Sequence, residues 1–359
     1  MFAVLLTGHG GFERLEWRED VPVPSPAAGE VLIRVGAAGV NNTDINTRAA
    51  WYSRAVTEGT TPSAAAEGFG ADAAADTGWT GTAFTFPRIQ GADACGRIVA
   101  VGAGVETSRL GERVLVEPVF RPPGSEDPGE ATYFGSECDG AFAEFARVPA
   151  RHAHRIHCDL TDAELASFPC AYSAAENMLT RAAVRAGERV LITGASGGVG
   201  SAAVQLARRR GATVTAIADP AKKGALEALG AARVLARDAL AAAIGPESVD
   251  AVIDVVGGHA FPSLLEALVR GGRYAVAGAI AGPIVDLDLR TLYLKDLRLL
   301  GCTVLDRPVF GNLVGYIERG EIRPLIAAIH PLRDIVAAQR EFLEKRHVGK
   351  IVLVPPAPT

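Results

Sequence analysis

The sequence lacks the features that mark several protein classes. Its 36 Lys and Arg against 41 Asp and Glu give a formal charge of −5, without a long basic run, so a nucleic-acid partner is not expected. No stretch approaches the ~18 consecutive apolar residues of a membrane span. The apolar start, MFAVLLTGHG, has no basic segment before it of the kind that opens a secretory signal. We therefore predict a cytoplasmic protein with a small-molecule substrate and no membrane partner.

Cysteine and histidine show no metal-binding spacing. The cysteines are odd in number and far apart, without a CxxC pair, which favours a reducing compartment over a disulfide framework. Their positions are Cys95, Cys138, Cys158, Cys170 and Cys302. Three histidines lie in RHAHRIH, residues 151–157, and we interpret this stretch as a solvated segment.

What is present is an apolar chain with two different patterns. Hydrophobic residues make up 48% of the 359 positions, enough for two folded domains. Short alternating strands occupy the first 45 residues and return near residues 97, 113 and 141, which predicts a β-rich region. Residues 48–86 are biased toward Gly, Ala and Asp, and we expect a long surface loop. The apolar GKIVLVP near the end is a strand that could rejoin the β-rich region.

From Thr161 onward, strands alternate with helices. Thr161 and Glu164 have capping-box spacing, and a series of strand and helix segments follows, ending with the strand LRLLGCTV, residues 297–304. Such alternation predicts an α/β fold with a doubly wound parallel sheet of six strands, covered by helices on both faces.

A glycine-rich turn joins one of these strands to a helix. The strand ERVLIT runs into TGASGGVG, in which Gly197, Gly198 and Gly200 would let the backbone approach a pyrophosphate at the helix N-terminus. A glycine-rich turn without a ligand is the alternative. The surrounding strand and helix repeat favours dinucleotide binding.

Several stretches together resemble a known family. GVNNTD (39–44), IQGADACGRIVAVG (89–102), DGAFAEF (139–145), AYSAAENML (171–179), the glycine turn and HVGKIVL (347–353) are similar to the medium-chain dehydrogenase/reductase superfamily, within it the zinc-free quinone oxidoreductase-like branch. The resemblance implies a GroES-like catalytic domain from residues 1–160 and 311–359, with 48–86 as an insert. It implies a Rossmann domain over 161–310.

The resemblance also implies a nicotinamide cofactor, and we expect NADPH rather than NADH. Lys222 and Arg237 fall where relatives contact the 2′-phosphate, although both could be solvated surface charges. Asp219, near the place of a ribose-binding acid, is better explained as a helix N-cap before Pro220. The other expected cofactor contacts are Asn42, Thr43, Ser173, Ser196, Gly197, Gly198, Val199 and Gly278.

Zinc-dependent relatives have metal ligands at positions that differ here. Asn41 and Ala92 stand at two ligand places and only Cys170 matches, so no zinc is expected. A zinc-free site suits hydride transfer to an enone, enoyl group or quinone, with Asn41 as a hydrogen-bond donor and Tyr52 as the proton donor. The alternatives are a polar turn at Asn41 and a loop anchor at Tyr52.

Three other functions stay open: a specialised-metabolism enzyme with an elaborate substrate, an alcohol dehydrogenase with a patchwork metal site from Asp44, Asp93 and Cys170, and a non-catalytic NADPH-binding protein. We expect the 48–86 insert to cover the substrate cleft. By resemblance, we expect a homodimer that pairs through residues 297–304.

Overall fold

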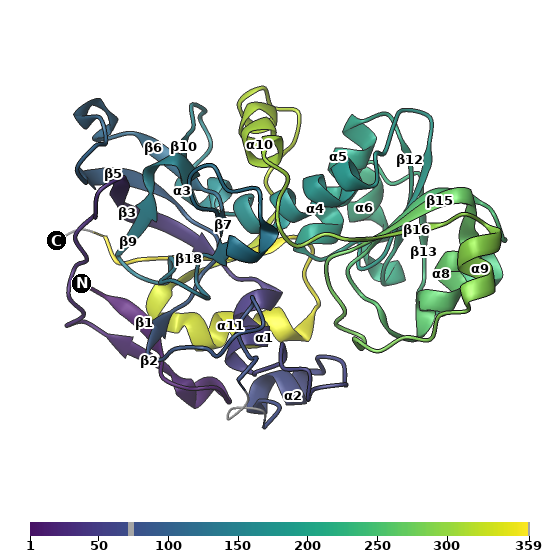
Figure 1. Ribbon diagram of the computed structural model, residues 1–359, viewed down its shortest axis with the longest axis horizontal. Coiled ribbons are helices and arrows are strands. Elements are labelled where there is room, and N and C mark those ends of the chain that lie inside the picture. The colour runs from purple at the N-terminus through teal and green to yellow at the C-terminus, as the bar shows by residue number, and fades with distance from the viewer. Residues whose placement is uncertain (71–74, 358–359) are drawn as a thin grey trace.

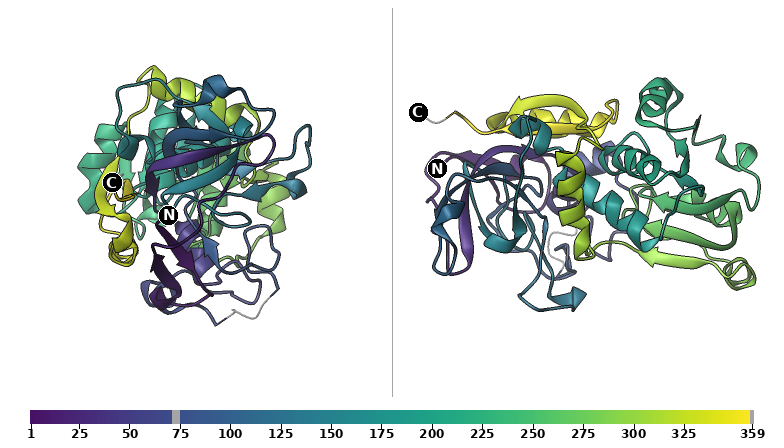
Figure 2. Two further views of the ribbon diagram at one scale, coloured as in Figure 1. Left: turned by 90° about the vertical axis from the view of Figure 1, so that its left-hand side faces the viewer. Right: turned by 90° about the horizontal axis from the view of Figure 1, so that it is seen from above.

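The computed structural model describes residues 1–70 and 75–357 of the chain. It has two domains side by side (Figure 1). The β-rich domain carries both ends of the chain, and Figure 2 shows the yellow C-terminal segment lying against the purple N-terminal strands. The predicted combination of a GroES-like domain and an α/β domain with a six-stranded parallel sheet is confirmed.

The β-rich domain is built around β3 (Glu30–Gly39), whose EVLIRV alternation buries Val31, Ile33 and Val35. β3 pairs with three other strands, including the C-terminal β18. The remaining strands of the domain are β1 (Ala3–Leu6), β2 (Leu15–Arg18), β4 (Arg88–Ile89), β5 (Cys95–Val101), β6 (Arg113–Val116), β7 (Val119–Phe120), β8 (Thr132–Tyr133), β9 (Phe145–Pro149), β10 (Ala153–Arg155), β17 (Ile326–Pro331) and β18 (Lys350–Val354). The C-terminal strand therefore rejoins the N-terminal sheet, as its apolar pattern indicated.

The α/β domain has a parallel sheet in the order β13-β12-β11-β14-β15-β16. Its strands are β11 (Arg189–Ile192), β12 (Thr213–Ile217), β13 (Arg233–Leu235), β14 (Val249–Asp254), β15 (Leu268–Val276) and β16 (Arg298–Gly301). The helices of the chain are α1 (Asn42–Arg48), α2 (Pro62–Glu67), α3 (Asp162–Leu165), α4 (Pro169–Arg181), α5 (Gly198–Arg209), α6 (Lys223–Leu229), α7 (Leu240–Ala243), α8 (Phe261–Ala267), α9 (Leu289–Leu294), α10 (Pro308–Glu318) and α11 (Ile335–Glu344). The strand order reverses between β11 and β14, and ligands of such sheets bind at this switch point, at the carboxyl ends of the strands.

The 48–86 insert is more ordered than its composition indicated. Thr61 caps α2 by accepting a hydrogen bond from the Ala64 amide at 3.2 Å. Arg48, fully buried, donates to the Ala65 carbonyl at 2.7 Å and so ties α2 to α1. Four residues of the insert, 71–74, lie outside the described part of the chain. The expectation of a continuous loop was wrong over α2 because a cap and a buried arginine, rather than apolar periodicity, hold this helix.

The histidine-rich segment is only partly the solvated stretch that its spacing indicated, since His157 is exposed but His152 and His154 are not. His152 is only 7% exposed, and Glu117 Oε2 lies 2.9 Å from its Nδ1 and 3.1 Å from Nε2 of His154. Burial alone raises the pKa of Glu117, but the two imidazoles outweigh it and lower the pKa to about 2. These histidines therefore form a structural cluster around one carboxylate.

Candidate active site

A narrow cleft of about 170 Å³ lies between the two domains, at the switch point of the parallel sheet. Both domains line it. The lining residues that matter below are Asn41, Asn42, Thr43, Trp51, Tyr52, Trp79, Tyr133, Cys170, Gly198, Val199, Gly278 and Lys350. The structure thus brings most of the predicted site residues together, although they come from distant parts of the sequence.

The glycine turn is tightly packed at Gly200 and close-packed at Gly198. Gly197 precedes the first residue of α5, and a Cβ on Gly200 would stand 2.2 Å from the Gly194 carbonyl oxygen. A Cβ on Gly198 would stand 3.1 Å from Cδ of Lys350. The first residues of this 12-residue helix, Gly198 and Val199, therefore line the cleft, and the N-terminus of a helix can hold a pyrophosphate.

A basic pair lies beside this turn. Lys222 Nζ donates to Ser196 Oγ at 3.2 Å, and to the carbonyls of Lys345 and His347 at 2.6 and 3.0 Å. Partial burial lowers the pKa of Lys222, and the nearby positive charge of Arg237 lowers it further. The two predicted 2′-phosphate contacts are therefore close to one another and to the turn.

Asp219 has the local role that the sequence indicated. Its Oδ1 accepts a hydrogen bond from the Ala221 amide at 2.8 Å, at the start of the short 3-10 helix Pro220–Lys222. The prediction of an N-cap is confirmed. The carboxylate is thereby engaged by its own backbone.

A buried lysine occupies the substrate side of the cleft. Lys350 is 2% exposed, and its ammonium donates to Asp93 Oδ2 at 2.7 Å, to the Val40 carbonyl at 2.9 Å and to Asn41 Oδ1. Asp93 is fully buried and also accepts from the Cys170 amide at 2.6 Å. We call Lys350, Asp93 and Asn41 the Lys350 cluster. All three ammonium hydrogens have acceptors, as a buried charge requires.

The cluster uses the amide of Asn41 completely. Its Nδ2 donates to Asp93 Oδ2 at 2.7 Å and to the Gly39 carbonyl at 3.3 Å, while its Oδ1 accepts from Lys350. Asn41 also begins α1, and its backbone amide donates to Asp44 Oδ2 at 2.7 Å. As arranged here, Asn41 shapes the cleft and holds Lys350, and it has no hydrogen left for a substrate.

The donor set does not fit zinc. Asn41 and Ala92 stand at two ligand places, Asp93 is bound by an ammonium, and burial raises the pKa of the remaining Cys170 thiol to about 12. Within residues 1–70 and 75–357, no group of three His, Cys, Asp or Glu side chains could hold a metal ion. Of the residues in the patchwork alternative, Asp44 accepts from the Asn41 amide at the start of α1, and Asp93 accepts from Lys350.

Tyr52 lies in the cleft with its hydroxyl bound to a neighbouring side chain. It lines the cleft half-buried, and its hydroxyl donates to Thr43 Oγ1 at 3.1 Å. Burial raises the pKa of Tyr52 to about 12, so the phenol stays protonated at neutral pH. Trp51 anchors the following loop, since its Nε1 donates to the Glu58 carbonyl at 3.0 Å. Tyr52 therefore remains a candidate proton donor, held by Thr43.

Two predicted cofactor contacts differ in their surroundings. Asn42 lines the cleft but is exposed, and its side-chain oxygen accepts from Lys345 Nζ at 3.0 Å. Ser173 is 1% exposed and donates to the Cys170 carbonyl at 3.2 Å, while the next residue, Ala174, lines the cleft instead. The helical register of α4 turns Ser173 inward, which the sequence motif does not reveal.

Tyr133 is a cleft residue that no sequence pattern singles out. Its hydroxyl lies 3.0 Å from Cys170 Sγ, yet it comes from a short strand among Pro- and Gly-rich turns. For Lys350 there is one signal in the sequence, a lone charge between a glycine and the apolar run IVLV.

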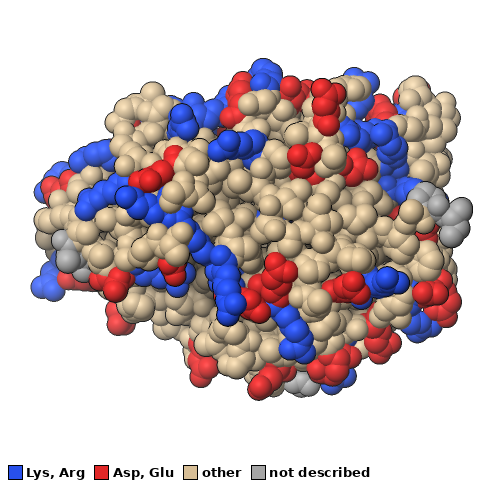
Figure 3. Space-filling model, turned by 180° about the vertical axis from the view of Figure 1, so that it is seen from behind, with Lys and Arg blue, Asp and Glu red and all other residues tan. Residues whose placement is uncertain are grey.

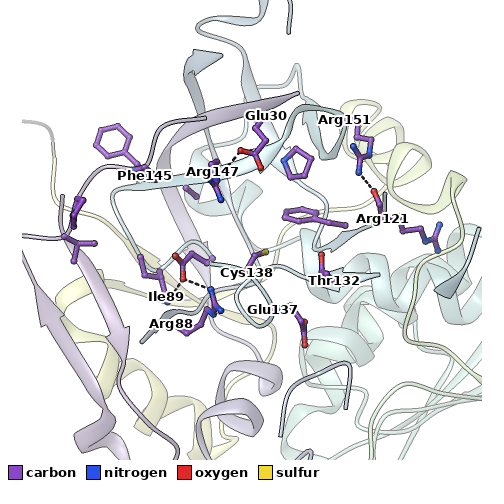
Figure 4. Close-up of a pocket in the computed structure, with 18 of the residues that line it drawn as sticks. Glu30, Arg88, Ile89, Arg121, Thr132, Glu137, Cys138, Phe145, Arg147 and Arg151 are labelled. Atoms are coloured by element: carbon purple, nitrogen blue, oxygen red, sulfur yellow. Dashed lines mark hydrogen bonds and ion pairs between the residues drawn. The ribbon is translucent and has the colours of Figure 1, made fainter. Parts of the chain in front are cut away.

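A larger cavity of about 600 Å³ lies elsewhere, within the β-rich domain (Figure 4). Charged side chains in it pair with each other: Arg88 with Asp139 at 3.1 Å and Arg147 with Glu30 at 3.2 Å. Neither the glycine turn nor the Lys350 cluster lines it. Size alone therefore does not locate the chemistry, and the interdomain cleft is the candidate active site.

The fold and the cleft define a class of proteins, two-domain dinucleotide-binding enzymes. Residues 27–158 match the family model described as alcohol dehydrogenase GroES-like domain, and residues 198–319 match the one described as zinc-binding dehydrogenase. The chain belongs to the medium-chain dehydrogenase/reductase superfamily, whose members are oxidoreductases that typically bind a nicotinamide cofactor.

Individual relatives carry different names. A crystal structure from Sinorhizobium meliloti 1021, provisionally named an alcohol dehydrogenase, is 47% identical, with a TM-score of 0.87 over 99% of this chain and 97% of that one. Acryloyl-coenzyme A reductase of Metallosphaera sedula is 29% identical over 98% of this chain and 99% of that protein. Quinone oxidoreductase of Rattus norvegicus is 27% identical over 99% and 98%. The resemblance to the superfamily is confirmed, while the names of the relatives leave the branch open.

Two general features of the molecule bear on its surroundings, the length of its apolar helices and the distribution of charge on one face. Within the described residues, no helix is both long enough and apolar enough to cross a membrane. On the face drawn in Figure 3, basic and acidic side chains lie beside one another around wide uncharged areas.

Proposed function

We propose that the protein is an NADPH-dependent, zinc-independent reductase that transfers hydride to an activated C=C bond or to a quinone. The observation that carries this proposal is the Lys350 cluster. An ammonium, rather than a metal ion, is the cation bound between Asn41 and Asp93. Reduction of a plain ketone calls for a strong electrophile at the oxygen. A conjugated acceptor spreads its charge and requires only hydrogen-bond donors.

In this mechanism the bound cofactor supplies the hydride. When the cofactor is bound, the amides at the start of α5 would hold its pyrophosphate, and Lys222 with Arg237 would hold the 2′-phosphate. The phenol of Tyr52 donates one proton to the reduced acceptor and recovers it from water, with Thr43 fixing the orientation of the hydroxyl. Quinone, one hydride and one proton thus give hydroquinone, while the cofactor is oxidised.

The preference for NADPH rests on the basic pair. In the described arrangement, Lys222 bonds only uncharged oxygens, those of Ser196 and two backbone carbonyls. The oxygens that now accept from Lys222 carry no negative charge, whereas a phosphate would supply one to pair with the ammonium. NADH would leave Lys222 and Arg237 without that anion.

Acceptor pairs that differ in one double bond test the reaction. Protein purified without chelator is supplied with NADPH and one acceptor at a time. The acceptors are 2-cyclohexenone, its saturated counterpart cyclohexanone, and 1,4-benzoquinone. We expect oxidation of NADPH by the enone or the quinone only, unchanged by a chelator. Turnover of cyclohexanone together with one zinc per chain would refute the proposal. NADPH binding without any turnover would indicate the non-catalytic alternative.

We also propose that the protein forms a homodimer through β16. This strand ends the parallel sheet, and in the described part of the chain it pairs only with β15. The edge lies beside α9 at the right of Figure 1. Several large apolar side chains of this segment are exposed, namely Ile284, Val285, Leu289, Tyr293, Leu294 and Leu299. A second copy related by a two-fold axis would satisfy the edge strand and cover these side chains.

A further inference from the structure

The cleft has an aromatic side. The rings of Trp79 and Tyr133 stack with centroids 4.8 Å apart and planes inclined by 29°, and both residues line the cleft. We call this pair the aromatic wall. Trp79 belongs to the 48–86 insert, and Tyr133 belongs to β8, so the wall forms only where these two segments meet.

One carboxylate fastens the two halves of the wall. Glu137 Oε1 accepts from the Thr80 amide at 3.0 Å and from the Thr80 hydroxyl at 3.1 Å, directly after Trp79 in the chain. Glu137 Oε2 accepts from the Tyr133 amide at 3.0 Å. Ser136 adds a weaker bond, accepting from the Trp79 amide at 3.4 Å. The backbone of both aromatic residues is thereby fixed before any ligand arrives.

The rest of the cleft carries little free charge. Among the lining residues only Lys350 is charged, and its three donors are used by the Lys350 cluster. The volume of about 170 Å³ lies below the ~300 to 1,000 Å³ of ordinary ligand sites. An acyl-coenzyme A would find no free cation there for its phosphates, whereas a flat uncharged ring suits an aromatic surface.

We propose that the aromatic wall selects a compact, uncharged, planar ring acceptor, a quinone or a cyclic enone, by stacking it against Trp79 beside the Tyr133 hydroxyl. This inference rests on the proposed function and narrows it. Burial raises the pKa of Tyr133 well above its ordinary value, so the hydroxyl stays a hydrogen-bond donor. Glu137 acts as a positioning residue through the wall.

The test compares a ring acceptor with an open-chain one. Trp79→Leu removes the stacking surface, and Trp17→Leu is the matched control, because Trp17 also stacks on a ring, that of Phe2 at 5.7 Å, and lies outside the cleft. We expect Trp79→Leu to lower kcat/KM for 1,4-benzoquinone about 10-fold, mainly through KM. The same change should alter kcat/KM for methyl vinyl ketone less than 2-fold, with the Kd of NADPH unchanged.

Several outcomes separate the explanations. Equal losses for ring and open-chain acceptors, or a wild-type preference for acryloyl-coenzyme A, would overturn the selection by the wall. Trp79→Phe should restore most of the quinone activity, which shows that a folding defect is not responsible for the loss. Glu137→Ala should raise KM for the quinone alone, and Glu137→Gln should raise it less because one acceptor oxygen remains.

Failure of the proposed function is recognised separately. If none of the conjugated acceptors supports oxidation of NADPH by the wild type, the reductase proposal fails. Ring binding is then measured directly, by quenching of tryptophan fluorescence with hydroquinone in the presence of NADP⁺. Weaker hydroquinone binding by Trp79→Leu would still support the wall. Equal binding by wild type and variant would refute it.

Discussion

Replacing Lys350 by methionine should destabilise the β-rich domain strongly. The two side chains have similar length, so the main change is loss of the ammonium. Val40 and Asn41 each lose a donor, and the carboxylate of Asp93, fully buried, loses its counter-charge. The perturbation therefore tests whether a buried ion pair holds the cleft together.

The expected loss in the free energy of unfolding depends on the hydrogen-bond donors that Asp93 retains in the variant. Removing one partner of a buried pair costs about 3 to 5 kcal/mol, because the other charge stays buried. Asp93 retains two donors, the side chain of Asn41 at 2.7 Å and the Cys170 amide at 2.6 Å. We therefore expect the free energy of unfolding to fall by about 3 kcal/mol, the lower end of that range.

A double-mutant cycle measures the pairing itself. Asp93→Asn removes the negative charge, so Lys350→Met in that background should cost about 2 kcal/mol less than it does alone. Urea unfolding followed by tryptophan fluorescence is suited to this measurement. The chain has 3 Trp, at positions 17, 51 and 79, all in the β-rich domain. The signal therefore reports that domain even when the two domains unfold separately.

A second lysine, five residues before Lys350, offers a control for the loss of an ammonium group. Lys345 is exposed, and Lys345→Met should change the free energy of unfolding by less than about 0.5 kcal/mol. A loss below about 1 kcal/mol for Lys350→Met, or strictly additive effects with Asp93→Asn, would refute the pairing described here.

Four further changes have defined outcomes. Tyr52→Phe should lower kcat for the enone about 100-fold with an unchanged Kd for NADPH, and an unchanged kcat would exclude Tyr52 as the proton donor. The double variant Lys222→Ala with Arg237→Ala removes both positive charges, and it should bind NADPH about 100-fold more weakly in a fluorescence titration while its affinity for NADH changes little. Equal losses of affinity for the two cofactors would contradict recognition of the 2′-phosphate. Leu299→Asp should convert a dimer to a monomer in light scattering, and a monomeric wild type would refute pairing through β16. Burial raises the pKa of Asp44 from 3.8 to about 7, so the stability gained from its proton is complete below pH ~4 and is lost as the pH rises through ~7, a difference of about 4 kcal/mol. Asp44→Asn should abolish this slope in the free energy of unfolding, and a slope unchanged by the substitution would assign it to another group.

Much of the α/β domain could be predicted because its signals are local. Each strand and helix carries its own apolar period, and the tight turn before α5 requires bare backbone at Gly200. The cap at Asp219 follows from two adjacent residues in the same way. Local signals fail at one place: apolar residues at helical spacing continue from Phe261 to Arg270, but Leu268 pairs with Val249 and begins β15. Pairing with a distant strand outweighed local periodicity there.

The candidate site was only partly predictable, since its contacts span the chain. The sequence by itself determined that a dinucleotide turn stands at a strand-to-helix junction, and that the usual metal ligands are replaced at Asn41 and Ala92. Only the tertiary structure decided that Lys350 reaches Asn41, 309 positions away, and that Tyr133 meets Trp79 in the cleft. Backbone preferences depend on neighbouring residues, whereas the partner of a buried charge or ring depends on which segments pack together and exclude water.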